Sequence, residues 1–227
     1  MHYKQWWLTG FCCSFILSYS YAQDWANLKR YQKQNSDIGM ANVDQQRVVF
    51  MGNSITESWL SMRPEFFAGK PYINRGISGQ TTPQMLARFK NDVLDLRPAV
   101  VVILAGINDI AGNTGPTTID AIANNIFSMA EQATANNITV LLCAVLPATD
   151  FGWNPEMEPS VQVIALNDLL KAYTSEHNLI YVDYFSAMVN EVNGLKEELG
   201  IDQVHPNAAG YAVMEPLIER ALAEAIK

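Results

Sequence analysis

The chain has 227 residues, of which 49% are hydrophobic and 17% are charged, and its formal net charge at pH 7 is −8. This length and composition predict one globular domain with a sizeable core rather than two domains. The acidic balance argues against nucleic acid and anionic membrane surfaces as partners, so we expect a small-molecule or carbohydrate substrate of low charge.

Residues 1–22 differ from the rest of the chain and are typical of a secretory signal peptide. Lys4 is followed by the apolar stretch 6–17, and the residues up to Ala22 include small side chains where a signal peptidase reads them. We therefore expect an exported protein, periplasmic or extracellular, cleaved after Ala22. The alternatives are a transmembrane anchor, for which the stretch is short, and a lipid anchor at Cys12.

The expected mature protein is a single domain over residues 23–227 with no stable membrane insertion. It keeps one cysteine, Cys143, so an internal disulfide cannot form despite export. Because Cys143 lies in an apolar run, it is expected to fill the core.

Residues 23–46 are predicted to form a helical extension packed on the domain. Asp24 can cap a short helix whose apolar side chains fall on one side, namely Trp25, Leu28 and Tyr31. This helix is expected to pack as an amphipathic element without a catalytic role.

Five apolar runs separated by helical stretches follow, which is typical of parallel strands joined by helices. The runs lie at residues 48–51, 72–74, 100–105, 139–145 and 180–182. The third run is continuously apolar, as expected for a central strand that helices cover on both faces. The chain is therefore predicted to be an α/β protein, a three-layer α/β/α sandwich.

The segments between the strands carry helix-start signals and one long loop. The predicted helices are 85–96 after Thr82 and Pro83, 119–135 after Thr117 or Thr118, and 208–225 after Asn207 with a kink at Pro216. The loop, residues 146–160, leaves the C-terminal end of the fourth strand, where open α/β sheets bind ligands. It is a candidate wall of the substrate pocket, with Trp153 as a tentative pocket residue.

Four short segments carry the residue types that acyl transfer needs, and three of them follow an apolar run. They are residues 52–56 (Gly-Asn-Ser-Ile-Thr), 76–79 (Gly-Ile-Ser-Gly), 106–109 (Gly-Ile-Asn-Asp) and 202–205 (Asp-Gln-Val-His). Together they supply a hydroxyl nucleophile, a base with its orienting carboxylate, and donors for a developing oxyanion. We expect them to form one hydrolytic site.

The nucleophile and base are expected from the first and last segments. Ser54 stands at a strand-to-helix turn that suits a nucleophile, although a serine there can also serve only as a helix cap. Asp202 precedes His205 by three residues, so its carboxylate can accept a bond from Nδ1 and leave Nε2 to take the serine proton. The other mature histidine, His177, is expected to be a solvated surface residue.

The two middle segments can supply oxyanion donors. Gly79 lets the backbone approach a ligand closely, and its amide can donate to the oxyanion, although it can equally be a turn glycine. Asn108 follows the central strand and can add a side-chain amide, or it can cap a turn.

Other chemistries find less support in the sequence. It contains no GxGxxG and no Walker-type glycine loop, so no nucleotide cofactor is indicated. Two mature histidines and one core cysteine argue against a catalytic metal, and no cofactor is expected. Residues 52–56 read GxSxT rather than the GxSxG of the α/β-hydrolase elbow.

With these four blocks in order between residues 48 and 205, the chain resembles the SGNH hydrolases, also called the GDSL esterase/lipase family. The resemblance implies a flavodoxin-like sandwich with a five-stranded parallel sheet in the order 2-1-3-4-5. It also implies a catalytic triad of Ser54, Asp202 and His205, and an oxyanion hole formed by the Ser54 N–H, the Gly79 N–H and Asn108. Asn53 stands where the family usually has Asp, and it is a tentative pocket residue.

The expected function is a serine esterase that removes acetyl or another short acyl group from carbohydrate. A lysophospholipase or acyl thioesterase of the same family is the alternative and would need an apolar groove. Four residues after the nucleophile are candidates to line such a groove: Trp59, Leu60, Met62 and Phe66. A non-catalytic glycan-binding module on the same scaffold is a further alternative, because a fold does not guarantee chemistry.

Overall fold

The computed structural model describes residues 24–40, 46–152, 154 and 157–226. The predicted signal peptide and the tentative pocket residue Trp153 lie outside these described residues. Within them, no helix is both long enough and apolar enough to cross a membrane.

Five parallel strands form one sheet in the order β2-β1-β3-β4-β5, which confirms the predicted topology. The strands are β1 (Val48–Gly52), β2 (Tyr72–Gly76), β3 (Val100–Leu104), β4 (Thr139–Cys143) and β5 (Ile180–Val182). Every residue of β1 and β3 is buried, because helices cover both faces of the sheet centre.

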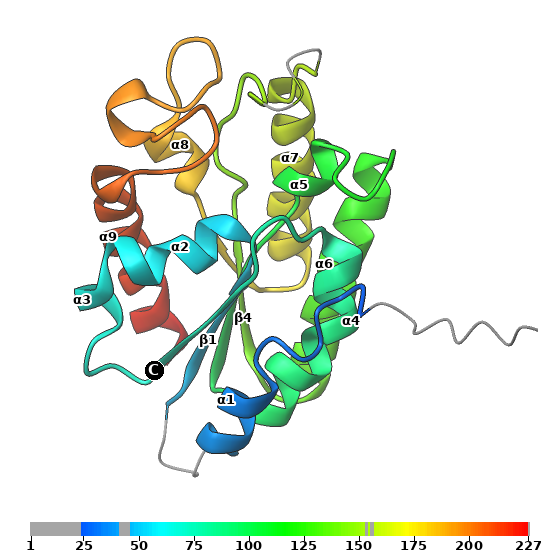
Figure 1. Cartoon of the computed structure of the whole chain (residues 1–227), viewed down its shortest axis with the longest axis vertical. Coiled ribbons are helices and arrows are strands. Elements are labelled where there is room, and N and C mark those ends of the chain that lie inside the picture. The colour runs from blue at the N-terminus through cyan, green and yellow to red at the C-terminus, as the bar shows by residue number, and fades with distance from the viewer. Residues whose placement is uncertain (1–23, 41–45, 153, 155–156, 227) are drawn as a thin grey trace, which may run out of the picture.

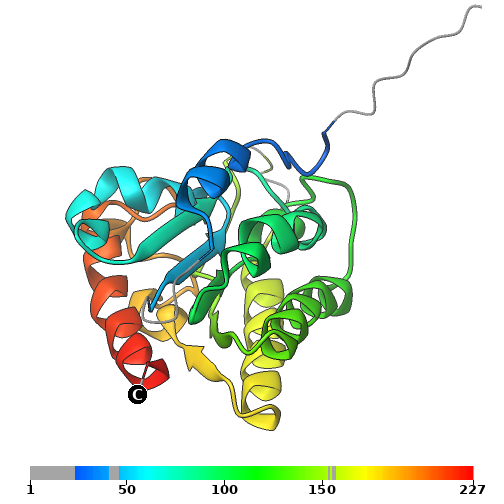
Figure 2. The same ribbon diagram turned by 90° about the horizontal axis from the view of Figure 1, so that it is seen from below.

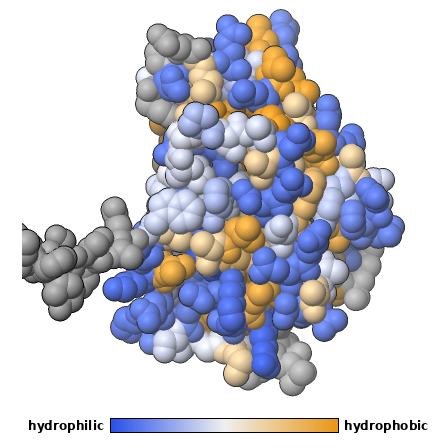
Figure 3. All heavy atoms as spheres, turned by 90° about the vertical axis from the view of Figure 1, so that its right-hand side faces the viewer, coloured by the Kyte–Doolittle hydropathy of each residue, from blue (hydrophilic) through white to orange (hydrophobic). Residues whose placement is uncertain are grey.

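Helices flank the sheet on both sides and give the three predicted layers (Figures 1 and 2). One layer contains α4 (Thr82–Asp92), α6 (Ile119–Ala135) and α7 (Ser160–Glu176). The other contains α2 (Ser54–Met62), α3 (Pro64–Phe67), α8 (Tyr184–Met188) and α9 (Ala208–Ala225). Short α1 (Gln32–Ile38), α5 (Ile107–Ile110), η1 (Leu94–Leu96) and η2 (Glu197–Leu199) complete the described elements. Figure 3 shows the face over α4, α6 and α7, where hydrophilic residues predominate and apolar ones lie between them.

The side chains that begin the helices explain most of the predicted boundaries. Thr118 accepts the Ala121 N–H at the start of α6, and Asn207 accepts the Gly210 N–H at the start of α9, as predicted. The helix predicted over 85–96 is instead two elements, because α4 ends at Asp92 and a 3₁₀ turn follows.

The predicted helix beginning at Asp24 is wrong. Residues 25–31 form turns, since Asn27 has a positive φ of 55° that a right-handed helix cannot contain. Asp24 still accepts the N–H groups of Leu28 and Lys29, but the helix itself is α1. Of the side chains expected to pack inward, Trp25 is 53% exposed and only Tyr31 is buried.

Aromatic side chains pack the layer of α2, α3 and α9 onto the sheet. Trp59 stacks on Phe66 and Tyr211 at centroid distances of 4.9 and 5.3 Å and meets Phe50 of β1 edge-on. All four rings are buried. Cys143 is also buried, as predicted, and burial raises the pKa of its thiol to about 12.

The first three strands end together and thereby position the functional segments. In the sheet register Gly52 at the end of β1 pairs with Gly76 of β2 and Leu104 of β3. A Cβ on Gly76 would lie 2.1 Å from the Glu57 nitrogen, so only glycine lets β2 approach the start of α2. From β1 the chain continues to β2 on one side and then returns to β3 on the other side of β1. The strand order therefore reverses between β1 and β3, and the C-terminal edge of these strands is a topological switch point, where α/β folds bind ligands.

Candidate active site

Ser54, His205 and Asp202 form one hydrogen-bonded series. Ser54 Oγ lies 3.0 Å from His205 Nε2, and His205 Nδ1 lies 2.9 and 3.1 Å from the two carboxylate oxygens of Asp202. The structure therefore brings Ser54 into contact with His205, which lies 151 positions later in the sequence, and His205 into contact with Asp202. With Nδ1–H donating to the carboxylate, Nε2 carries the lone pair that can accept a proton from Ser54.

Asp202 is held by more than its histidine partner. Its Oδ1 accepts the backbone N–H groups of Val204 and His205 at 2.8 and 2.7 Å. Partial burial by itself raises the pKa of the Asp202 carboxyl, but these bonds and the one from the His205 ring hold the pKa below its ordinary value. Asp202 therefore remains a carboxylate at neutral pH, which favours the Nδ1–H form of His205.

Ser54 is the first residue of α2, so its backbone N–H has no acceptor within the helix. Asn53 is the N-cap, and its Oδ1 accepts the Ile55 N–H at 3.1 Å. Asn53 is only 1% exposed and does not line the cleft, so its tentative placement as a pocket residue is wrong. The local reason is the cap, which turns this side chain into the helix terminus.

The expected oxyanion donors lie beside the nucleophile. Gly79 has a φ of +78°, a conformation that favours glycine, and it lines the same cleft as Ser54 and His205. Asn108 also lines this cleft, and one of its amide hydrogens donates to the Gln80 carbonyl at 2.9 Å. A carboxamide has two such hydrogens, so the second remains for a ligand.

The cleft has a volume of about 500 Å³. Besides the residues described above, it is lined by Ser58, Ser78, Asn113, Ile201, Pro206 and Tyr211. No described residue of the 146–160 loop is among them, so the lining that the structure describes comes from other segments. This loop instead contacts the histidine segment, since Thr149 Oγ1 bonds Gln203 Oε1 at 3.3 Å.

The four candidate groove residues also do not line this cleft. Trp59 and Phe66 are buried in the aromatic cluster, whereas Leu60 and Met62 are exposed. His177 is exposed and lies against Tyr173, as expected for a surface residue.

Arg88 is a buried residue near the site that the sequence did not single out. Its guanidinium donates to the carbonyls of Gly52 and Arg75 at 3.0 and 2.9 Å and to Gln80 Oε1 at 2.6 Å. It also pairs with Asp92 at 3.0 Å. Arg88 thus ties the ends of β1 and β2 to the residue whose carbonyl holds Asn108, a role that emerges only once these strands are adjacent.

Asp109 links the third segment to the start of α4. Its carboxylate accepts the Thr82 N–H at 2.9 Å and the Thr82 hydroxyl at 2.6 Å. Burial raises the pKa of Asp109 to about 6, although these hydrogen bonds act in the opposite direction. These bonds therefore hold Asp109, the residue that follows Asn108, against the first turn of α4.

Replacing Asn108 by alanine is expected to lower kcat for an ester substrate by about 10²–10³-fold, the usual cost of losing one oxyanion donor. KM should change little, because the bond strengthens as charge develops on the oxygen. Steady-state kinetics with p-nitrophenyl acetate measures both constants, and Asn136→Ala on an exposed helix end is the control. Unchanged kcat in the Asn108 variant would remove this side chain from the oxyanion hole.

Comparison with known proteins yields a family match over most of the chain. A model of the GDSL-like Lipase/Acylhydrolase family matches residues 50–213. The crystal structure of a GDSL-like lipase from Bacteroides thetaiotaomicron is 45% identical with a TM-score of 0.86, covering 88% of this chain and 98% of that one.

Two curated relatives are more distant. Esterase TesA of Pseudomonas aeruginosa is 26% identical over 163 residues, which are 70% of this chain and 75% of the relative. An acetylxylan esterase of Geobacillus stearothermophilus is 26% identical over 149 residues, which are 63% of this chain and 67% of the relative. Both relatives bear the names of esterases.

Proposed function

Since the chain belongs to the GDSL-like lipase/acylhydrolase family and is a carboxylic ester hydrolase, we propose that it is an exported serine esterase that removes acetyl or other short acyl groups from carbohydrate. The observation that carries the proposal is the hydrogen-bonded series from Asp202 through His205 to Ser54 at one cleft. The series contains a carboxylate, an imidazole and a hydroxyl in the order that acyl transfer to a serine requires.

In the first half of the reaction, Ser54 Oγ attacks the ester carbonyl carbon while His205 Nε2 takes the serine proton. The carbonyl electrons move to oxygen, and the Ser54 N–H, the Gly79 N–H and the Asn108 amide stabilise the resulting oxyanion. The tetrahedral intermediate then expels the alcohol, which receives the proton from Nε2. The acyl group remains bonded to Ser54.

In the second half, a water molecule takes the place of the alcohol. His205 Nε2 accepts a proton from this water as its oxygen attacks the acyl carbon, and the same donors stabilise the second oxyanion. Collapse breaks the bond to Ser54 Oγ, which regains its proton from Nε2. The carboxylic acid leaves, and Asp202 remains a carboxylate throughout.

The preference for short acyl groups rests on what lines the cleft. Of the four candidates for a long-chain groove, Trp59 and Phe66 are buried in the core and the exposed Leu60 and Met62 lie outside the cleft. Around the nucleophile the cleft combines the polar side chains of Ser58, Ser78 and Asn113 with the apolar surface of Ile201, Pro206 and Tyr211, and the polar side chains suit a hydroxyl-rich alcohol. Similarity to an acetylxylan esterase supports the same substrate class.

Export is part of the proposal and rests on the sequence of residues 1–22. The cleaved form would begin at Gln23. Fractionation of cells that express the full chain, with N-terminal sequencing of the product, tests both the location and the cleavage site. Retention of Met1 on an intracellular product would contradict it.

A chain-length series of p-nitrophenyl esters is expected to give the highest kcat/KM with acetyl. Each added methylene that the pocket cannot accommodate is worth about tenfold or more, so octanoate should be much poorer. Release of acetate from acetylated xylo-oligosaccharide is the matching measurement on a carbohydrate. A maximum at eight carbons or beyond would instead identify a lipid or thioester substrate.

A further inference from the structure

The N-terminal segment, residues 24–39, contacts the loop that carries Gly79. We refer to residues 76–81 as the oxyanion loop. The Tyr31 hydroxyl donates to the Gly76 carbonyl in the buried interior, and Gln80 Nε2 donates to the Ala26 carbonyl at 2.8 Å. The segment thus contacts the oxyanion loop at its first residue and again just after Gly79.

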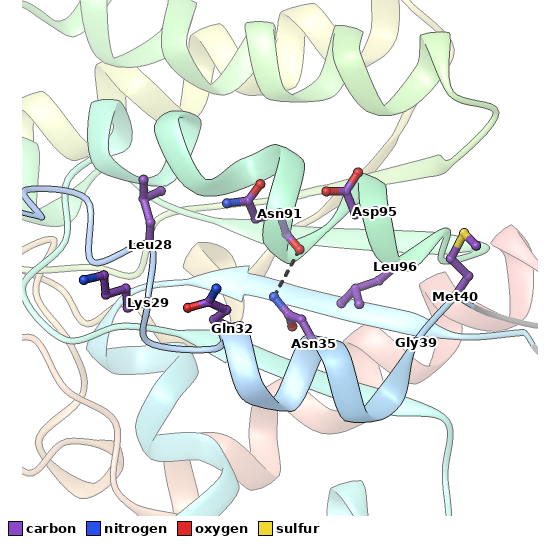
Figure 4. A pocket seen from close by; sticks show the side chains of 9 residues that line it. All are labelled: Leu28, Lys29, Gln32, Asn35, Gly39, Met40, Asn91, Asp95 and Leu96. Atoms are coloured by element: carbon purple, nitrogen blue, oxygen red, sulfur yellow. Dashed lines mark hydrogen bonds between the residues drawn. The ribbon is translucent and has the colours of Figure 1, made fainter.

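The same segment is fastened along α4 (Figure 4). Asn35 Nδ2 donates to the Asn91 carbonyl at 3.1 Å and to the Asp92 carboxylate at 2.7 Å, and Asn35 Oδ1 accepts from the Arg75 guanidinium. Figure 4 shows the Asn35 side chain pointing across to α4. The segment is therefore held both at Ala26, by Gln80, and at Asn35, by α4. Its side chains consequently meet the oxyanion loop from fixed positions.

Glu57 connects this segment to the oxyanion loop. One oxygen of its carboxylate accepts both the Ser78 N–H, at 2.8 Å, and the Ser78 hydroxyl. The other accepts from Arg30 at 2.8 Å. Burial raises the pKa of Glu57, but the bonds from Ser78 and Arg30 outweigh it and hold the pKa below its ordinary value. Glu57 lies one helical turn after Ser54, so the first turn of α2 carries the nucleophile and also holds the oxyanion loop.

The peptide unit between Ser78 and Gly79 carries the N–H proposed for the oxyanion hole. The unit before it is fixed by the Ser78 N–H bond to Glu57. The unit after it is fixed by the Gly79 carbonyl, which accepts from Asn113 Nδ2 at 3.2 Å. A glycine at φ +78° has no side chain to restrain it. The direction of the Gly79 N–H therefore depends on both flanking bonds.

We propose that Glu57, with Arg30 from the N-terminal segment, is a positioning residue that aims the Gly79 N–H at the oxyanion. The role rests on the proposed function, because it requires acyl transfer at Ser54. It also gives the N-terminal segment a part in catalysis although none of its residues lines the cleft. If the Glu57–Arg30 salt bridge served stability alone, its removal would lower the thermal midpoint and leave the turnover of folded enzyme unchanged.

The test compares Glu57→Ala, Glu57→Met and Glu57→Gln in the full chain. Methionine keeps the reach of the side chain without its acceptors, and glutamine keeps one oxygen for Ser78. Glu57→Ala and Glu57→Met are expected to lower kcat for p-nitrophenyl acetate by about 10- to 100-fold at similar KM, the effect of a misaimed group. Glu57→Gln should recover most of this loss. Glu65→Ala, an exposed pair with Arg63, is the matched control.

A thionoester substrate provides the readout that a stability effect would not move. Sulfur is a poorer hydrogen-bond acceptor than oxygen, so an aimed oxyanion hole makes the enzyme prefer p-nitrophenyl acetate over p-nitrophenyl thionoacetate. This preference should shrink in Glu57→Ala and Glu57→Met and persist in Glu57→Gln. Arg30→Met should reduce it in part, with the exposed Lys33→Met on the same segment as control.

The outcomes separate the two proposals. If the wild type turns over the acetate ester and both Glu57→Ala and Glu57→Met keep its kcat and its oxygen preference, the positioning role is overturned and the proposed function stands. If the wild type shows no turnover and no labelling by a fluorophosphonate, the proposed function fails, and the positioning role fails with it.

Discussion

Ser54→Ala is expected to lower kcat for p-nitrophenyl acetate by about 10⁶-fold, to the level left by binding and the oxyanion donors. The reason is geometric as well as chemical. Ser54 Oγ is the hydroxyl that meets His205 Nε2, at 3.0 Å, and alanine removes it without changing the start of α2. Steady-state kinetics with enzyme purified from a host free of background esterase measures the loss.

The control for Ser54→Ala is Ser61→Ala, an exposed serine on the same helix. The Ser61 hydroxyl donates to the helix carbonyl of Ser58, so the kcat of this variant should stay within about twofold of the wild-type value. A Ser54 variant with more than one percent of wild-type kcat would mean that the acyl group is transferred elsewhere.

Asp202→Asn is expected to lower kcat by about 10⁴-fold while the protein stays folded. The wild-type carboxylate accepts from Nδ1–H and leaves Nε2 without a proton, as the base must be. An asparagine amide can donate to Nδ1 instead, which favours the tautomer with the proton on Nε2 and so blocks proton transfer from Ser54. The pKa of Asp202 lies below its ordinary value, so the wild type keeps this charge across neutral pH.

Kinetics and circular dichroism of Asp202→Asn are measured beside Asp95→Asn, whose carboxylate pairs with the exposed Lys90. The Asp95 variant should behave as wild type. Retention of a tenth or more of wild-type kcat in Asp202→Asn would show that His205 needs no charged partner.

Strand positions and the residues of the candidate catalytic series could be predicted because their signals are local. A continuously buried strand such as β3 needs apolar residues at every position, and Thr118 and Asn207 cap helices by bonds within one turn. Ser54 is recognisable because it stands at a strand-to-helix turn, and His205 because Asp202 precedes it by three residues. Their contact then follows from a sheet order that brings the strand ends to one edge.

The features that could not be predicted depend on long-range packing. Arg88 gains its role only when β1 and β2 are neighbours, because its partners are backbone carbonyls with no sequence signature. Glu57 similarly reads as an ordinary helix residue until Ser78 and Arg30 approach it. Apolar periodicity at Trp25 and Leu28 predicted a helix, but local turns at Asn27 prevailed.

Asn53 shows how position can mislead about role. Its place beside the nucleophile indicated contact with substrate, yet the backbone turn between β1 and α2 directs its side chain to the Ile55 N–H inside the protein. Asparagine and aspartate are about equally good N-caps, so this substitution keeps the helix start.

Labelling with a fluorophosphonate tests most directly whether Ser54 is a nucleophile activated by His205. The reagent bonds covalently to activated serines, and intact-mass measurement followed by peptide mapping locates the adduct. We predict one adduct per chain on Ser54, absent from Ser54→Ala and strongly slowed in His205→Ala. An unmodified wild-type chain, or an adduct on another serine, would contradict the proposed mechanism.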